Sequence, residues 1–237
     1  MFTRYFSALS IVFAFVFVVS TWAGTFRDDF QDGDLEGWQQ FWPVGADVWE
    51  VVNGELACSR LTDHSAEIVT GEISWTDYTI ECDIKLLEDH GAGDFSIIAR
   101  VSSGNKGYGF LVGDWVGESA AYTQKWPELN MKVIEPLESL ELGVWHHLKL
   151  EVEGGEFTYW VDGEIVIEYE DDSYTSGMLG FGVANYTARC DNVVITGPDV
   201  PDVLPDTWQK QLDEPEPGRP VDPGSRLITA WARIKSN

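Results

Sequence analysis

Residues 145–169 read WHHLKLEVEGGEFTYWVDGEIVIEY, and this stretch decides the fold class. Hydrophobic and polar residues alternate in each of its three parts, which are separated by Gly154-Gly155 and by Asp162-Gly163. Alternation with a period of two is typical of a strand with one buried face, and such glycine pairs are typical of tight turns. The stretch therefore predicts three consecutive strands joined by hairpins.

The same pattern extends on both sides of this stretch. Residues 49–56 predict a hairpin whose turn is Asn53-Gly54, because Asn-Gly is the strongest local signal for a two-residue turn. No helical period is sustained between Phe26 and Gly197. Ten or more short strands at this spacing predict an all-β, two-sheet antiparallel jelly-roll sandwich. Further strands are expected at residues 79–87, 95–101, 108–112, 179–184 and 189–195.

The ends of the chain differ from this central part. Arg4, the apolar run to Val19 and the small-residue site ending at Ala23 predict a signal peptide over residues 1–23, with an uncleaved anchor as the alternative. Residues 24–197 are then the jelly-roll domain, residues 198–226 a linker rich in proline and acidic residues, and residues 227–237 a short amphipathic tail. We therefore expect a secreted, periplasmic or cell-surface protein that has no membrane contact after cleavage.

Charge limits the ligands of this protein. The chain has 40 acidic and 15 basic residues, which give a formal net charge of −25 at pH 7. Nucleic acids are excluded as partners, because binding them requires basic side chains that replace counterions on the phosphates. A neutral polysaccharide or glycoconjugate carries no such penalty, and the 11 Trp, 8 Tyr and 12 Phe residues supply flat faces for sugar rings.

Several of these segments together resemble a known superfamily. Residues 145–152 and 159–164 resemble the central signature of laminin-G-like and pentraxin-like domains, residues 26–34 resemble an opening strand of that fold, and residues 177–182 and 190–195 resemble its closing strands. The resemblance implies a concanavalin A-like jelly roll. The chain is also similar to 3-keto-disaccharide hydrolase-type domains. The scaffold hosts lectins, hydrolases, lyases and adhesion domains, so the resemblance leaves the function open.

No catalytic residue is assigned from the sequence. Glu81 and Asp83 resemble the first two acids in the Glu-x-Asp-x-Glu strand of laminarinase-like hydrolases, but Lys85 occupies the third position. We therefore predict a solvated face, on which the lysine offsets the two acids. His146 and His147 are expected to pack and to form hydrogen bonds within their strand.

A candidate ligand site lies in residues 113–127, where glycines separate Trp115, Tyr122 and Trp126. At least two of these three rings are expected to be exposed and to stack on pyranose faces, and the alternative is that they fill the core. Strand alternation is expected to bring Arg100 and Tyr108 onto the same face. These five residues are the predicted ligand site.

Asp29 and Asp191 are a candidate site for structural calcium. Both lie beside strands at the two ends of the domain, which are often neighbours in a jelly roll, and clustered carboxylates suit a hard cation. Ordinary turn acids are the alternative. The sequence as a whole predicts a module that binds a glycan without cleaving it. The alternatives are a glycoside hydrolase of the 3-keto-disaccharide type and an adhesion domain.

Overall fold

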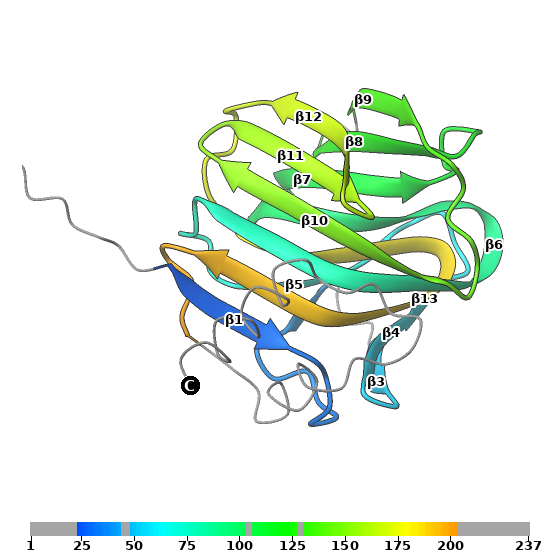
Figure 1. The fold of residues 1–237 in the computed structure, drawn as a ribbon, viewed down its shortest axis with the longest axis horizontal. Helices are drawn as coiled ribbons and strands as arrows, with labels where there is room; N and C mark the ends of the chain where they lie inside the picture. The colour runs from blue at the N-terminus through cyan, green and yellow to red at the C-terminus, as the bar shows by residue number, and fades with distance from the viewer. Residues whose placement is uncertain (1–22, 44–47, 103–105, 128–129, 203–237) are drawn as a thin grey trace, which may run out of the picture.

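The computed structural model describes residues 23–43, 48–102, 106–127 and 130–202. Most of the predicted signal peptide, most of the linker and the whole tail lie outside these residues. Every regular element in the described part is a strand, and the prediction of an all-β jelly roll is confirmed (Figure 1). No helix in the part that the structure describes is long and apolar enough to cross a membrane.

The described residues form 13 antiparallel strands, of which two are much longer than the rest. The strands are β1 (Gly24–Asp28), β2 (Gln39–Trp42), β3 (Trp49–Val52), β4 (Glu55–Ser59), β5 (Ala66–Thr70), β6 (Tyr78–Ser102), β7 (Lys106–Gly113), β8 (Ala120–Trp126), β9 (Asn130–Pro136), β10 (Trp145–Glu153), β11 (Glu156–Val161), β12 (Glu164–Glu170) and β13 (Met178–Gly197). The segments predicted at residues 79–87 and 95–101 are therefore parts of a single strand, β6.

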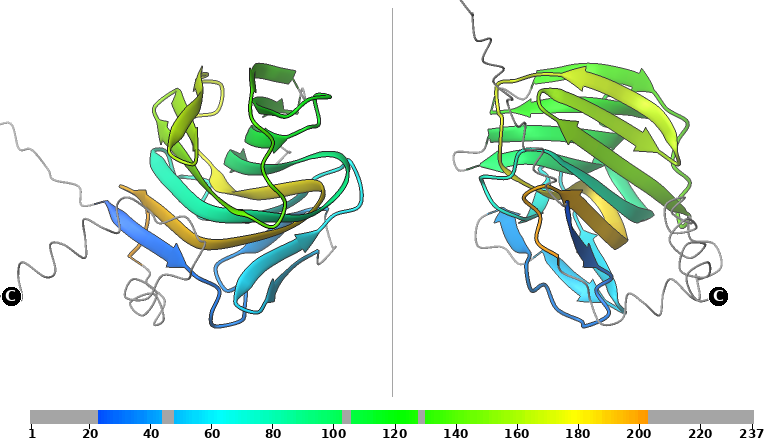
Figure 2. Two further views of the ribbon diagram at one scale, coloured as in Figure 1. Left: turned by 45° about the vertical axis from the view of Figure 1, so that its right-hand side comes forward. Right: turned by 60° about the vertical axis from the view of Figure 1, so that its left-hand side comes forward.

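The long strands β6 and β13 build the sandwich, because each runs through both layers (Figure 2). In the first layer, the order is β3-β4-β13-β6-β10-β11-β12, and β1 also pairs with β13. In the second layer, the order is β2-β5-β13-β6-β7-β8-β9. The pairing of β6 with β13 shifts register near Ala184 to Tyr186, between the two layers.

The predicted hairpins are present and have the expected turn geometry. Asn53 and Gly54 have φ values of 57° and 75°, and Asp162 and Gly163 have φ values of 51° and 86°. Two successive positive φ values are the requirement of a type I′ turn, which Asn-Gly and Asp-Gly satisfy at low cost. The local sequence therefore determines where β3 meets β4 and where β11 meets β12.

The core lies between the two layers and follows the strand alternation. In the first layer, Ile80, Cys82 and Ile84 are fully buried, and in the second layer Phe95 and Phe181 are. Burying side chains of this size stabilises the fold by about 1.5–3 kcal/mol each. The intervening residues point away from the core, so the outward face of each layer is free to carry polar and functional groups.

Candidate functional site

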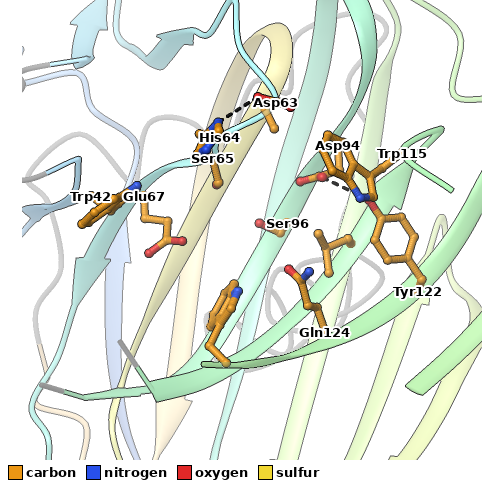
Figure 3. Close-up of a pocket in the computed structure, with 13 residues that line it drawn as sticks. Trp42, Asp63, His64, Ser65, Glu67, Asp94, Ser96, Trp115, Tyr122 and Gln124 are labelled. Atoms are coloured by element: carbon orange, nitrogen blue, oxygen red, sulfur yellow. Dashed lines mark hydrogen bonds and ion pairs between the residues drawn. The ribbon is translucent and has the colours of Figure 1, made fainter. Parts of the chain in front are cut away.

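A pocket of about 390 Å³ opens on the outward face of the second layer (Figure 3). The pocket is built on one lateral row of register partners, in which each residue pairs with the next across six neighbouring strands. That row is Trp42, Glu67, Gly182, Ser96, Leu111 and Tyr122, from β2, β5, β13, β6, β7 and β8. Strand pairing thus brings together residues that are far apart in the sequence.

Small residues make the floor of the pocket. Gly182 lies between Glu67 and Ser96 in the lateral row, and Ala184 follows on the same strand. A Cβ atom on Gly182 would lie 2.5 Å from the Ser96 hydroxyl oxygen and 2.7 Å from the Ser65 hydroxyl oxygen. Glycine at this position therefore allows the Ser65 and Ser96 hydroxyls, which line the pocket, to lie close to the strand.

Three indole rings surround this floor. Trp42 is 42% exposed at the end of β2, Trp115 is half-buried in the segment after β7, and Trp126 is 8% exposed at the end of β8. Tyr122 also lines the pocket but is fully buried. The structure therefore brings together Trp115, Tyr122 and Trp126, as the sequence analysis expected. The expectation that at least two of them would be exposed is wrong, because the pocket is recessed and neighbouring side chains cover the rings.

Asp94 forms one wall of the pocket. Its Oδ2 accepts a hydrogen bond of 3.0 Å from the Tyr122 hydroxyl, and its Oδ1 has no hydrogen-bond partner among the described residues. Burial raises the pKa of Asp94 to about 7; the Tyr122 hydrogen bond opposes this rise, and the charge of Asp114 adds to it. The carboxyl group therefore exchanges its proton near neutral pH.

Glu67 stands on the other side of the floor, and Figure 3 shows the two carboxyl groups on opposite sides of Ser96. Glu67 is only 6% exposed. Burial raises its pKa to about 7, and the charge of Asp94 contributes to the rise. Two carboxyl groups with perturbed pKa values in one pocket are a recognised mark of a functional site.

Arg100 and Tyr108 do not belong to this pocket, and the prediction that they share its face is wrong. Arg100 has a φ of 52° at a register shift, and this breaks the alternation of β6. Its guanidinium donates to the backbone carbonyls of Tyr174, Thr76 and Gly154. Tyr108 is fully buried against Phe157 in the core. Both residues hold the sandwich together.

Glu81 and Asp83 face outward from the first layer, on the other side of the molecule from the pocket. The prediction of a solvated face is wrong for Asp83, which is 3% exposed. Its carboxylate accepts hydrogen bonds from His147 Nδ1 at 2.9 Å and from Asn192 Nδ2 at 2.7 Å. Burial alone would lower the pKa of His147, but hydrogen bonds and the nearby carboxylate charge raise it to about 10. The imidazolium links β6 to β10, as expected for a histidine that packs within its strand.

The candidate calcium residues lie where the first and last strands meet, since β1 pairs with β13. Asp29 accepts a hydrogen bond from the backbone N–H of Gln31, and Asp191 accepts one from the backbone N–H of Asn192. No cluster of three or more His, Cys, Asp or Glu side chains in the described ranges is arranged to hold a metal ion. Calcium at Asp29 and Asp191 stays a prediction.

Trp42, Glu67 and Asp94 line the pocket but were not predicted from the sequence. Glu67 had a signal of its own, because it is the one charged residue in the segment Ala66–Thr70. A charged residue in a strand that is otherwise buried is unusual unless it has a function or a partner. Trp42 and Asp94 had no comparable signal, since only the lateral pairing of strands brings them to the pocket.

Two curated relatives and a carbohydrate-binding module of known structure are among the proteins that are similar to this chain. The levanase of Bacillus subtilis (strain 168) is 25% identical over 150 residues, which are 61% of this chain and 22% of that protein. The extracellular exo-alpha-L-arabinofuranosidase of Streptomyces chartreusis is 25% identical over 166 residues, which are 65% of this chain and 20% of that protein. The chain thus spans about a fifth of either relative. The carbohydrate-binding module CBM66 from Bacillus subtilis superposes with a TM-score of 0.56 at 22% identity, over 68% of this chain and 96% of the module.

A second solved structure has the same fold, and a family model identifies the family to which the chain belongs. A putative glycosyl hydrolase from Parabacteroides distasonis superposes with a TM-score of 0.51 at 18% identity, over 72% of this chain and 92% of that one. The model of the 3-keto-alpha-glucoside-1,2-lyase-like domain matches residues 25–196, which is nearly the whole sandwich. The resemblance to 3-keto-disaccharide hydrolase-type domains is therefore confirmed, and the chain belongs to the family of 3-keto-alpha-glucoside-1,2-lyase-like domains.

Proposed function

We propose that the pocket on the second layer binds a sugar ring and that the protein works on glycans outside the cytoplasm. The observation that carries the proposal is the set of three indole rings, Trp42, Trp115 and Trp126, around one recessed floor. The C–H faces of a pyranose are complementary to the electron-rich faces of such rings. Gln124 and Ser96 lie among them and can hydrogen-bond the ring hydroxyls.

The relatives support this proposal. The two curated relatives are named as enzymes that act on sugar polymers or glycosides, and the superposed module is named for carbohydrate binding. One relative is also named as extracellular, which agrees with the predicted signal peptide. Export is tested by intact-mass analysis of the mature protein, which should begin at Gly24.

Binding is tested with a glycan array, followed by calorimetry on the wild type and single variants. Trp42→Ala and Trp115→Ala should each weaken binding by about 1–3 kcal/mol, by analogy with aromatic stacking on bases. Trp160→Ala is the matched control, because it removes an indole from the first layer, where Lys149 covers the ring. Undiminished binding by both pocket variants, or silence across the array, would contradict the proposal and favour an adhesion domain.

A second candidate function, glycoside cleavage, is favoured by Glu67 and Asp94. Two carboxyl groups whose pKa values are raised to about 7 can serve as base and acid at neutral pH. On a 3-keto glucoside, the base would remove the C2 proton, which the adjacent ketone acidifies. The C1–C2 double bond would form as the C1–O bond breaks, and the acid would protonate the departing oxygen. This elimination consumes no water and no oxidant.

Cleavage is tested by incubating the protein with a methyl 3-keto-α-glucoside and following the conjugated enone by absorbance. Glu67→Gln and Asp94→Asn should each lower the rate by about 10²–10⁴-fold, the usual contribution of general acid–base catalysis. Glu72→Gln is the matched control, because Glu72 is an exposed acid that lines a different cavity. If the wild type binds sugars but releases no product, the protein is a binding module only.

A further inference from the structure

The side chains that line the pocket include three acids and one histidine. Glu67, Asp94 and Asp63 contribute carboxyl groups, and neither lysine nor arginine is among the described residues that line the pocket. His64 is 78% exposed, and its Nδ1 lies 2.8 Å from an Asp63 carboxylate oxygen. Two buried carboxyl groups therefore face the pocket, and the basic side chain among its described lining residues is that of the exposed His64.

Three basic side chains on or beside the second layer have partners of their own. Arg60 Nε donates to the backbone carbonyl of His64 at 2.7 Å. Lys125 bonds to Asp171 at 3.0 Å and to the Ser173 hydroxyl at 2.6 Å. Arg100 is turned into the core, where backbone carbonyls hold it. The charge of another acid, Asp114, adds to the effect of burial and raises the pKa of Asp94 further. Among the described residues, therefore, no lysine or arginine side chain lines this pocket and neutralises its carboxyl groups.

Asp94 presents an unsatisfied acceptor to the pocket. The residue is 6% exposed, and its Oδ1 has no hydrogen-bond partner in the described part of the chain. A buried acceptor left in this way is unfavourable until a donor reaches it. Glu67 is also 6% exposed and forms no hydrogen bond or ion pair with any described residue. A ligand that donates to both groups would satisfy the buried Asp94 Oδ1 and would give Glu67 a hydrogen-bond partner.

We propose that this pocket prefers a sugar that carries a free, protonated amine, such as a hexosamine, to the uncharged sugar of the same shape. The inference rests on the proposed sugar binding and defines the class of sugar. An ammonium group supplies three donors and a positive charge, and it can pair with either of the two buried carboxyl groups that line the pocket. The indole rings of Trp42, Trp115 and Trp126 favour a cation in the same space.

The test compares four methyl α-glycosides. Glucose, glucosamine and N-acetylglucosamine differ only at C2, and glucuronic acid differs from glucose only at C6. Calorimetry or NMR titration at pH 7 should give at least a tenfold tighter dissociation constant for glucosamine than for glucose. N-acetylation removes the charge and should remove this advantage, and the glucuronide should bind most weakly.

Variants distinguish the effect of the pocket carboxyl groups on amine binding from the effect of the protein's overall negative charge. The double variant Glu67→Gln/Asp94→Asn should bring the ratio of glucose to glucosamine dissociation constants close to one. Glu72→Gln changes the net charge outside the pocket and should leave the ratio unchanged. Equal binding of glucosamine and glucose by the wild type, or a preference that survives in the double variant, would refute the inference and leave sugar binding intact. Failure of the wild type to bind any of these sugars or any array glycan would refute the proposed function as well.

Discussion

Removing His147 should destabilise the fold strongly at pH 6 and only slightly at pH 10. The imidazolium side chain is 14% exposed and lies between Asp83 Oδ1, at 2.9 Å, and Glu81 Oε2, at 3.5 Å. The His147→Gln variant would leave the Asp83 carboxylate, which is 3% exposed, without its charged partner. Breaking a buried ion pair in this way costs about 3–5 kcal/mol.

The pH dependence of this loss follows from the pKa of His147. The pKa is about 10 in the folded state and 6.5 for an unperturbed histidine, so the folded state favours the protonated form. The stabilisation is fully present below pH 6.5, declines as the pH rises and is lost above pH 10. The difference in unfolding free energy between wild type and His147→Gln should therefore narrow from about 3–5 kcal/mol at pH 6 to below about 1 kcal/mol at pH 10.

Urea denaturation of both proteins at pH 6, 8 and 10 measures this difference. His64→Gln is the matched control, because His64 is 78% exposed and its pair with Asp63 should contribute less than about 1 kcal/mol at any pH. A loss for His147→Gln below about 1 kcal/mol at pH 6, or one of constant size up to pH 10, would refute the ion-pair explanation. The side chain would then act by packing alone.

Three further predictions concern stability. Glu67→Gln should stabilise the protein by about 2–3 kcal/mol at pH 8 and hardly at all at pH 4, as measured by thermal unfolding. The pKa of Glu67 is about 7 in the folded state and 4.5 for an unperturbed glutamate, so ionisation of Glu67 above pH 4.5 destabilises the folded state. Gly180→Ala should destabilise by at least about 1–3 kcal/mol in urea, because the new Cβ would lie 2.0 Å from the Ile68 carbonyl oxygen. If Asp29 and Asp191 hold calcium, a hundredfold excess over the dissociation constant should stabilise the wild type by about 2.7 kcal/mol, and Asp29→Asn/Asp191→Asn should not respond.

Most of the fold could be predicted from the sequence, because strands and tight turns depend on local patterns. The turns at Asn53-Gly54 and Asp162-Gly163 are where the sequence placed them, with the positive φ values that these residues accept easily. The alternation of residues 79–87 correctly separated the core face of β6 from its outer face. A pattern of period two predicts the face of each residue only where the strand is regular. Arg100 has a positive φ that interrupts β6, and for this reason the prediction that it faces the ligand site is wrong.

The sequence by itself determined the all-β sandwich and identified the segment that carries Trp115, Tyr122 and Trp126. Both follow from the alternation and spacing of residues that are neighbours in the chain. Only the tertiary structure decided that Trp42, Glu67 and Asp94 meet these rings in one pocket. Their meeting depends on which strands become neighbours and in what register, as in the pairing of Glu67 with Gly182 and of Gly182 with Ser96. Strand neighbours are chosen by the packing of the whole core, and so this information is not local to any segment of the chain.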